Sequence, residues 1–140
     1  MSHQEETQVI YHWQEAMSKT IGNRDLPGHM ELISKKVEVF GNPSKEHINY
    51  AGWYKRRKNE FEKGSVICVS YANTRIKTIT LRRIIFNVNE SIVGTDGRII
   101  MLNQDVILER EDDDQWRLVE QTIRSWKQYK MNDEVMASNG

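Results

Sequence analysis

Apolar residues near the N-terminus recur at intervals of three and four positions, which is the spacing of one helix face. They are Ile10, Trp13, Met17 and Ile21. This spacing predicts a helix from about Glu5 to Thr20, and Gly22–Asn23 ends it because both residues tolerate the left-handed backbone conformation. The first ordered element of the chain is therefore expected to be an amphipathic helix.

Two further helices and one strand are predicted before residue 65. A short helix begins near Asp25, which can cap it, with Pro27 in its first turn. Residues 36–40 alternate between apolar and polar and predict a strand, which Gly-Asn-Pro at 41–43 then turns. Residues 44–63 indicate an entry loop followed by a third helix.

The chain changes character after Ser65, where runs rich in Val, Ile, Thr and aromatic residues predict strands. These runs cover residues 66–71, 76–92, 98–109 and 116–126. Helices followed by a strand meander indicate an α+β fold, with N-terminal helices packed on one face of a curved antiparallel sheet. One domain is expected over residues 6–130, with disordered tails at 1–5 and 131–140.

Turn residues fix how the last strands pair. Thr95-Asp96-Gly97 resembles a three-residue hairpin loop, which pairs Ile92 with Ile100 and Phe86 with Val106. For the next hairpin we pair Leu108 with Leu118, because this register matches apolar with apolar residues; a slip of one position would invert the two faces.

These registers divide the sheet into a core face and an outer face. The core face carries Ile84, Phe86, Val88, Ile92, Ile100, Leu102, Val106, Leu108, Leu118 and Trp126. The outer face mixes polar residues with Ile85, Val93, Ile99, Met101, Ile107, Val119 and Ile123. A half-apolar outer face predicts a partner surface, and the simplest partner is a second copy of the chain.

This order of elements resembles the nuclear transport factor 2-like superfamily, which includes ketosteroid isomerases, scytalone dehydratase, polyketide cyclases and binding modules. The resemblance covers about residues 5–126 and rests on four segments. These are the first helix leading into Asn23-Arg24-Asp25-Leu26, the strand 37–40 with its turn, the helix after His47-Ile48, and the hairpin at 113–118. It implies a cystatin-like cone with a pocket between helices and sheet, and a homodimer formed through the outer sheet face.

Isomerase chemistry of the ketosteroid type is disfavoured within this resemblance. Such members place a base aspartate where the first strand meets its turn, but residues 40–43 hold no carboxylate. Trp13 stands nearest to their oxyanion tyrosine, and an indole donates a hydrogen bond but cannot accept one.

Polar residues on the predicted core face are the candidates for chemistry. They are Glu90, Gln104, Glu120, Thr122 and Arg124. In one interpretation they line a pocket in which Glu90 or Glu120 is a general acid or base and Arg124 holds an anionic group. In the other, Glu90 and Arg124 form a structural ion pair at the open end of the sheet.

Aromatic residues complete the candidate ligand site. Tyr50, Trp53 and Tyr54 cluster at the start of the third helix, where they either form a pocket mouth or pack in the core. We also expect Trp13 of the first helix to contact the ligand, together with Gln104, Thr122 and Trp126 of the sheet.

Composition narrows the possible partners. Twenty basic and 20 acidic residues give a formal net charge of zero, which disfavours nucleic acid and anionic membranes. Cys68 is the single cysteine and the histidines are scattered, so we expect no disulfide, metal or cofactor. No leader-like segment and no apolar run of about 20 residues is present, so we expect a cytoplasmic protein without a membrane span.

The preferred function is that of a homodimeric small-molecule-binding protein whose ligand is small and apolar. An alternative is a cofactor-free acid–base enzyme, such as a lyase, isomerase or cyclase, acting on a small apolar substrate. A second alternative is a protein-interaction subunit that uses the outer sheet face.

Overall fold

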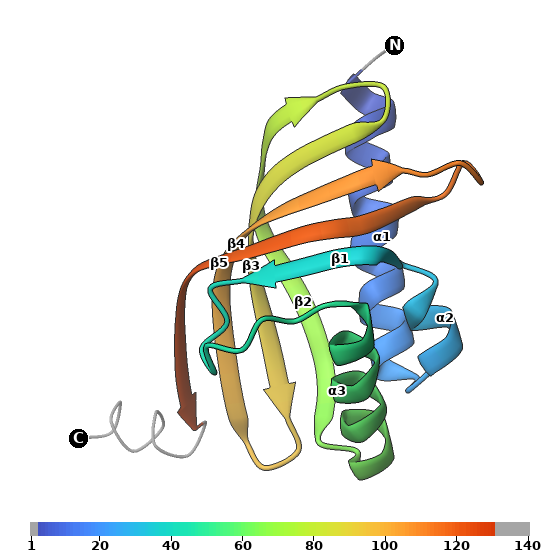
Figure 1. The fold of residues 1–140 in the computed structure, drawn as a ribbon. Coiled ribbons are helices and arrows are strands. Elements are labelled where there is room, and N and C mark those ends of the chain that lie inside the picture. The colour runs from blue at the N-terminus through green and yellow to red at the C-terminus, as the bar shows by residue number, and fades with distance from the viewer. Residues whose placement is uncertain (1–2, 131–140) are drawn as a thin grey trace.

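The computed structural model describes residues 3–130, which form three helices and five strands (Figure 1). In chain order these are α1 (His3–Gly22), α2 (Leu26–Met30), β1 (Ile33–Phe40), α3 (Tyr50–Lys63), β2 (Val66–Ile79), β3 (Arg83–Gly94), β4 (Arg98–Arg110) and β5 (Trp116–Lys130). The predicted C-terminal tail, 131–140, lies outside the described residues. The predicted N-terminal tail overlaps α1 at residues 3–5.

The helices have the boundaries that their capping residues specify. The Asp25 carboxylate accepts a hydrogen bond from the Gly28 amide and caps α2. Asn49 does the same for the Gly52 amide at the start of α3, and Gly64 ends α3 in the left-handed region at φ 62°. None of the described helices is both long enough and apolar enough to cross a lipid bilayer.

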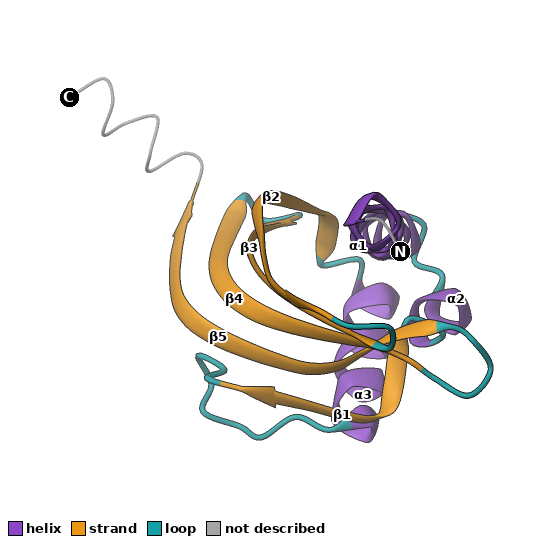
Figure 2. Ribbon diagram, turned by 90° about the horizontal axis from the view of Figure 1, so that it is seen from above, coloured by secondary structure: helices purple, strands orange, loops and turns teal. Residues whose placement is uncertain are grey.

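The five strands form one curved sheet in the order β1-β5-β4-β3-β2. Figure 2 shows the sheet bending around α3, which lies on its concave side. The α+β class is confirmed, but the sheet is mixed, because β1 pairs with β5 in parallel while the other pairs are antiparallel. The expectation of a purely antiparallel sheet is wrong at this one edge.

The β2–β3 hairpin turns later than predicted. β2 continues through residues 72–75, where the register shifts and Asn73 adopts a positive φ of 58°. Asn tolerates this conformation, so the segment forms a bulge within one strand. The hairpin closes at Thr80, whose amide donates to the Arg83 carbonyl, and the predicted single run over 76–92 is therefore two strands.

The two remaining hairpins differ in how well their register was predicted. The β3–β4 pairing is confirmed along its length, with Ile92 opposite Ile100 and Phe86 opposite Val106. In β4–β5 the predicted Leu108–Leu118 pair is present, but two bulges follow, so that Ile107 pairs with Glu120 and Leu102 with Trp126.

Each bulge adds one residue to β5 and inverts the faces beyond it. Between the bulges, Glu120 and Thr122 therefore lie on the outer face, opposite Ile107 and Asp105. Gln121 and Ile123, which were predicted on the outer face, point inward. The uniform register assumed for this hairpin is wrong beyond Leu118.

The core lies between the concave face of the sheet and the helices. Its main cluster includes Ile10, Trp13, Met17, Ile33, Val37, Trp53, Ile84, Phe86, Val88, Val106, Leu108 and Leu118. These include most of the residues predicted for the core face. Trp126 is an exception: it lies far along β5, its side chain is 49% exposed, and it does not belong to the core.

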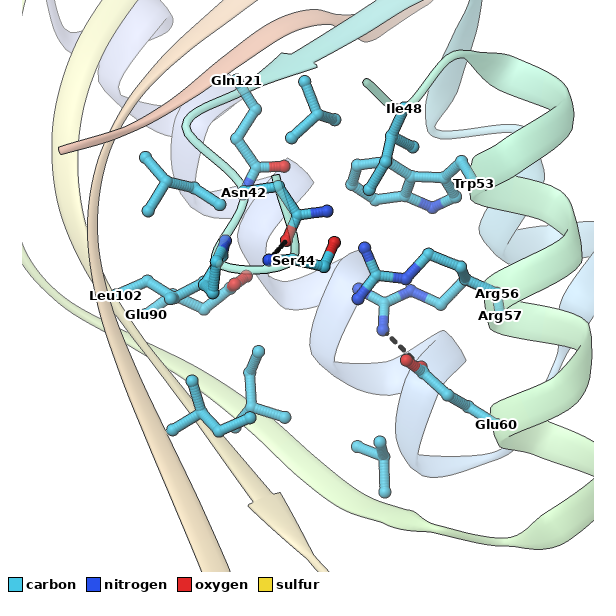
Figure 3. A pocket seen from close by; sticks show the side chains of 16 residues that line it. Asn42, Ser44, Ile48, Trp53, Arg56, Arg57, Glu60, Glu90, Leu102 and Gln121 are labelled. Carbon is cyan, nitrogen blue, oxygen red and sulfur yellow. Dashed lines mark hydrogen bonds and ion pairs between the residues drawn. The ribbon is translucent and has the colours of Figure 1, made fainter. Parts of the chain in front are cut away.

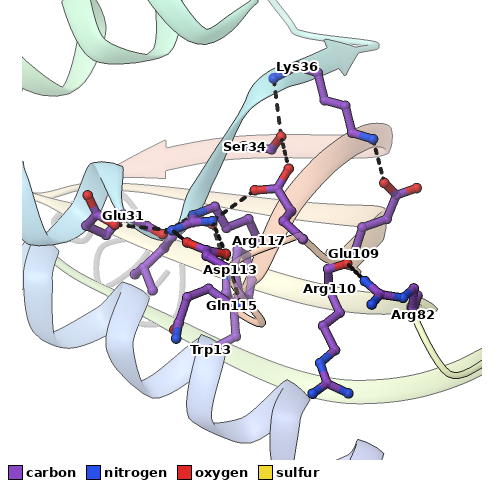
Figure 4. Close-up of polar contacts among 12 residues, drawn as sticks. Trp13, Glu31, Ser34, Lys36, Arg82, Glu109, Arg110, Asp113, Gln115 and Arg117 are labelled. Carbon is purple, nitrogen blue, oxygen red and sulfur yellow. Dashed lines mark hydrogen bonds and ion pairs between the residues drawn. The ribbon is translucent and has the colours of Figure 1, made fainter.

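A charged cluster around Arg117 joins α2, β1 and the β4–β5 turn (Figure 4). The guanidinium donates to the Glu31 carbonyl and to the carboxylates of Glu31, Glu111 and Asp113, at 2.8–3.2 Å. Glu111 in turn accepts a hydrogen bond of 2.8 Å from the Ser34 hydroxyl. These contacts use all five N–H donors of the arginine.

Candidate functional site

A cavity of about 300 Å³ lies between α3, the segment that follows β1, and the concave face of β3, β4 and β5 (Figure 3). Its apolar lining consists of Val39, Pro43, Ile48, Trp53, Val66, Ile92, Ile100, Leu102 and Ile123. Its polar lining consists of Asn42, Ser44, Arg56, Arg57, Glu60, Glu90 and Gln121. The cavity is thus mainly apolar, with a small set of polar groups.

Helical spacing in α3 brings three polar or aromatic residues to the cavity wall. Trp53, Arg57 and Glu60 are four and three positions apart, so they share one face of the helix. Arg57 Nη1 donates to Glu60 Oε2 at 2.6 Å, and the Arg57 guanidinium carbon lies 5.4 Å from the centre of a Trp53 ring.

The Arg57 side chain is only 13% exposed. Burial alone would lower the pKa of Arg57, but the carboxylates of Glu60 and Glu90 raise it, so the guanidinium stays charged.

His29 in α2 holds this face of α3 in place. Its Nε2 atom accepts hydrogen bonds from Trp53 Nε1 at 3.0 Å and from Arg57 Nε at 3.2 Å. The ring proton must therefore be on Nδ1, which donates to the Thr20 hydroxyl at 3.1 Å. Burial, and then the charge of Arg57, lower the pKa of His29 to about 3, so the imidazole is neutral.

Glu90 is a buried carboxylate without a cation of its own. Its side chain belongs to β3 and is 5% exposed, and within the described residues no Lys, Arg or His nitrogen lies within 4 Å of it. Burial raises the pKa of Glu90, and the positive charge of Arg57 opposes this rise. Tyr71 approaches Glu90 from β2, but the geometry is too poor for a hydrogen bond.

Asn42 presents an unused donor at the cavity. Its Oδ1 atom accepts a hydrogen bond from the Ser44 amide at 3.2 Å, which fixes the orientation of the side chain. Its Nδ2 atom is buried and has no partner among residues 3–130. Gln121 also lines the cavity, where its amide donates to Gln104.

Of the residues predicted to contact a ligand, only Trp53 lines the cavity directly. Gln104 lies behind Gln121. Trp13 donates to the Leu32 carbonyl at 3.1 Å within the core. The other three aromatic residues do not line the cavity: Tyr50 is partly buried beside the core, and Tyr54 and Trp126 are exposed.

The predicted catalytic group is only partly brought together. Glu90 lines the cavity, but Glu120 and Thr122 lie on the outer face because of the bulges in β5. Arg124 Nε donates to Asp105 at 2.7 Å, which places Arg124 on the outer face as well. Both earlier interpretations of Arg124 are therefore wrong: it neither lines the cavity nor pairs with Glu90.

Asp105 is instead the centre of a polar cluster on the outer face. Burial would raise the pKa of Asp105, but hydrogen bonds from Asn87, Lys77 and Arg124 lower it to about 2. Asn87 also exchanges two hydrogen bonds of 3.0 Å with Asn103. This cluster is internally paired.

Four site residues were missed by reasoning from the sequence. They are Asn42 after β1, His29 on α2, and Arg57 and Glu60 on α3. Helical spacing with Trp53 could have indicated Arg57 and Glu60. No local pattern indicates His29, because its partner Arg57 is 28 positions away in the chain.

A metal site in the described residues would need several ligands close together. Among residues 3–130, no three His, Cys, Asp or Glu side chains are grouped to hold a metal ion.

Comparison with known proteins places the fold but not the function. No family model and no curated protein matches the sequence. Two structural neighbours are NTF2-like proteins. One, from Cytophaga hutchinsonii, has a TM-score of 0.67 and 16% identity over 88% of this chain and 98% of that one. The other, of unknown function, from Shewanella oneidensis, has a TM-score of 0.71 and 12% identity over 84% and 97%.

A third similar structure carries an enzyme name. It is a candidate scytalone dehydratase from Novosphingobium aromaticivorans, with a TM-score of 0.70 and 14% identity over 89% of this chain and 87% of that one. Together with the curved sheet and its helices, these likenesses show that the chain has the nuclear transport factor 2-like α+β cone fold. Because unrelated activities share such folds, the function must be argued from the cavity.

Proposed function

We propose that the chain is a cytoplasmic small-molecule-binding protein whose ligand lies in the cavity beneath α3. The observation that supports this most is the set of buried, unpartnered polar groups on a mainly apolar wall. Glu90 has no cation and Asn42 Nδ2 has no acceptor among the described residues. Buried polar groups are rarely left unpaired unless a ligand or water satisfies them.

The size and lining of the cavity define the ligand in outline. A volume of about 300 Å³ accommodates a molecule at the small end of the range for ligand pockets. Ile92, Ile100 and Leu102 form a continuous apolar wall on β3 and β4, next to Glu90. The ligand is therefore expected to have a compact apolar body and a polar group at one end.

Filling the cavity tests this proposal. Cyclohexylmethanol is a suitable neutral probe, and binding is followed by amide chemical shifts in NMR spectra. The wild-type chain should show shifts at cavity residues, and Ile123→Trp should abolish them because the larger ring occupies the space. Ile67→Trp, at an exposed position of β2 that does not line the cavity, is the matched control and should bind as the wild type does. Shifts that survive Ile123→Trp would contradict binding in this cavity.

A second candidate function is a cofactor-free acid–base enzyme, and the state of Glu90 favours it. A carboxyl group with a raised pKa and no ion-pair partner suits proton transfer near neutral pH. The fold is also that of the candidate scytalone dehydratase, whose name denotes a lyase. An enzyme of this kind should exchange a carbon-bound proton of a bound ligand for solvent deuterium, and Glu90→Gln should stop the exchange without stopping binding.

We also propose that two copies of the chain pair through the outer sheet face. Ile85, Val93, Ile99 and Met101 are partly exposed on this face, beside the hydrogen-bonded Asn87 and Asn103. Light scattering during gel filtration should give a dimer for the wild type and a monomer for Met101→Glu, because a charge would then lie in the interface. Tyr54→Glu, on the exposed side of α3, should remain dimeric. A monomeric wild type would contradict the pairing.

A further inference from the structure

Hydrogen-bond donors converge at one end of the cavity. Figure 3 shows the Arg56 and Arg57 side chains extending from α3 towards Asn42 and Ser44, with Glu60 on the same helix and Glu90 on the sheet. Arg57 makes two hydrogen bonds within the described residues, to His29 and Glu60, so three of its five N–H groups have no protein acceptor. Asn42 Nδ2 is a further buried donor without a partner.

The balance of charge in the cavity depends on whether Glu90 is protonated. Arg56 and Arg57 both line the cavity, but Glu60 pairs with Arg57 alone, and Arg56 has no ion-pair partner among residues 3–130. His29 cannot supply compensation, because it is neutral and its Nε2 already accepts two hydrogen bonds. With Glu90 ionised, the four charged side chains of the cavity balance; once Glu90 is protonated, one positive charge and several N–H donors are left for something that is not part of the chain.

Resting on the proposed function, we propose that the ligand is a small apolar carboxylic acid whose carboxylate lies between Arg56, Arg57 and Asn42. Guanidinium groups bind carboxylates through paired N–H donors, and a buried amide donor adds direction to that contact. The hydrocarbon part would then cover the apolar wall of Ile92, Ile100 and Leu102. The anion-holding role once expected of Arg124 falls to arginines on α3.

Glu90 gives this binding a distinctive pH dependence. The groups that influence its titration are Tyr71 on β2 and Arg57 and Glu60 on α3. A ligand carboxylate in the same cavity disfavours the ionised form of Glu90, so binding should be accompanied by proton uptake. Affinity for the acid should therefore rise as the pH falls below neutrality, whereas affinity for a neutral alcohol should change much less.

Three probes with the same ring separate charge from shape. Cyclohexanecarboxylate, cyclohexylmethanol and cyclohexylmethylamine are titrated separately into the protein and followed by NMR. The carboxylate should bind about tenfold more tightly than the alcohol, a difference typical of one good charged contact, and the amine should bind most weakly. Arg56→Gln should remove most of the preference for the carboxylate without affecting the alcohol.

Lys58→Gln is the matched control, because Lys58 is an exposed cation on α3 that does not line the cavity. It should leave all three affinities unchanged. Arg56 is exposed, so its replacement is not expected to disturb folding, and a thermal melt of each variant checks this.

The outcomes distinguish the two proposals. Equal or weaker binding of the carboxylate relative to the alcohol, or an effect of Lys58→Gln as large as that of Arg56→Gln, would overturn the acid assignment and leave cavity binding intact. If none of the three probes shifts cavity residues, the proposed function fails and the acid assignment fails with it.

Discussion

Two arginines in this molecule lie among carboxylates, and they differ in what remains unsatisfied. Arg117 donates all five N–H groups to protein acceptors, and its partners Glu31 and Asp113 reach solvent. Arg57 donates only two, to His29 and Glu60, and the rest of its guanidinium faces the cavity. Their side chains are about equally covered, at 14% and 13% exposed.

The difference separates a structural role from a binding role. An arginine whose donors are all used joins elements and has no donor left for a ligand, whereas an equally covered arginine with free donors retains its capacity to bind. The exposed fraction of the side chain does not separate the two arginines, but the number of N–H groups that have protein acceptors does. The predictions below test whether the two clusters behave as differently as their hydrogen bonds indicate.

Removing Arg57 should have the largest effect. Arg57→Ala leaves Glu60 and the His29 Nε2 atom without a major partner and opens space beside Trp53. Breaking a buried ion pair in this way typically costs about 3–5 kcal/mol, so we expect the free energy of unfolding to fall by about 3 kcal/mol in urea titrations. Lys58→Ala, next to it on the exposed side of α3, should change it by less than about 0.5 kcal/mol.

Acid should destabilise the fold through His29. Its pKa is 6.5 when unfolded and about 3 in the fold, so below pH 6.5 the unfolded chain binds the extra proton and stability falls. The slope approaches 1.36 kcal/mol per pH unit only once the unfolded histidine is mostly protonated, so the loss between pH 6.5 and about 4.5 is about 2 kcal/mol. Urea titrations across this range should show the loss in the wild type.

The variant His29→Gln isolates this contribution. It should be less stable than the wild type at neutral pH, but should lose little more on acidification. Comparing the two also cancels Glu90, whose raised pKa acts in the opposite direction by favouring the protonated folded state. Parallel losses in the two proteins would show that His29 is not the titrating group.

Features of the structure that depend on local interactions could be predicted from the sequence, whereas features that depend on distant contacts could not. The three-residue loop at 95–97 fixes the β3–β4 register through its own geometry, so that pairing was predicted correctly. In β5, two adjacent apolar residues, Leu118 and Val119, precede two adjacent polar ones, and this pattern fits either face. The bulges that decide between the faces depend on contacts with β4 that alternation does not reveal.

The site was harder to predict than the fold for a related reason. Glu90 was placed correctly because it belongs to the well-fixed β3–β4 pair, and Glu120 was misplaced because it lies beyond a bulge. The contact of His29 with Arg57 joins two helices whose relative position only the folded sheet determines. Which buried groups lack partners is likewise a property of the assembled cavity.

Replacing Glu90 should stabilise the fold, because Glu90 is a buried cavity residue without an ion-pair partner among the described residues. Glu90→Gln removes a buried carboxylate that has no cation, so we expect the free energy of unfolding at neutral pH to rise by about 1 kcal/mol. The gain should shrink as the pH falls, because the folded state of the wild type then takes up the proton that relieves the charge. Glu120→Gln, on the outer face, should change stability at neutral pH by less than about 0.5 kcal/mol.

The smallest effect is expected at Arg117. After Arg117→Ala, Glu31 and Asp113 are hydrated at the surface, so little unsatisfied charge remains, and we expect a loss of about 0.5 kcal/mol in urea titrations. Much of that loss should disappear in about 1 M NaCl, because salt screens exposed charges, while the loss caused by Arg57→Ala should persist because His29 is buried and the Arg57 and Glu60 side chains are mostly covered. A loss at Arg117 that equals the loss at Arg57 and resists salt would show that the number of used donors does not distinguish the two clusters.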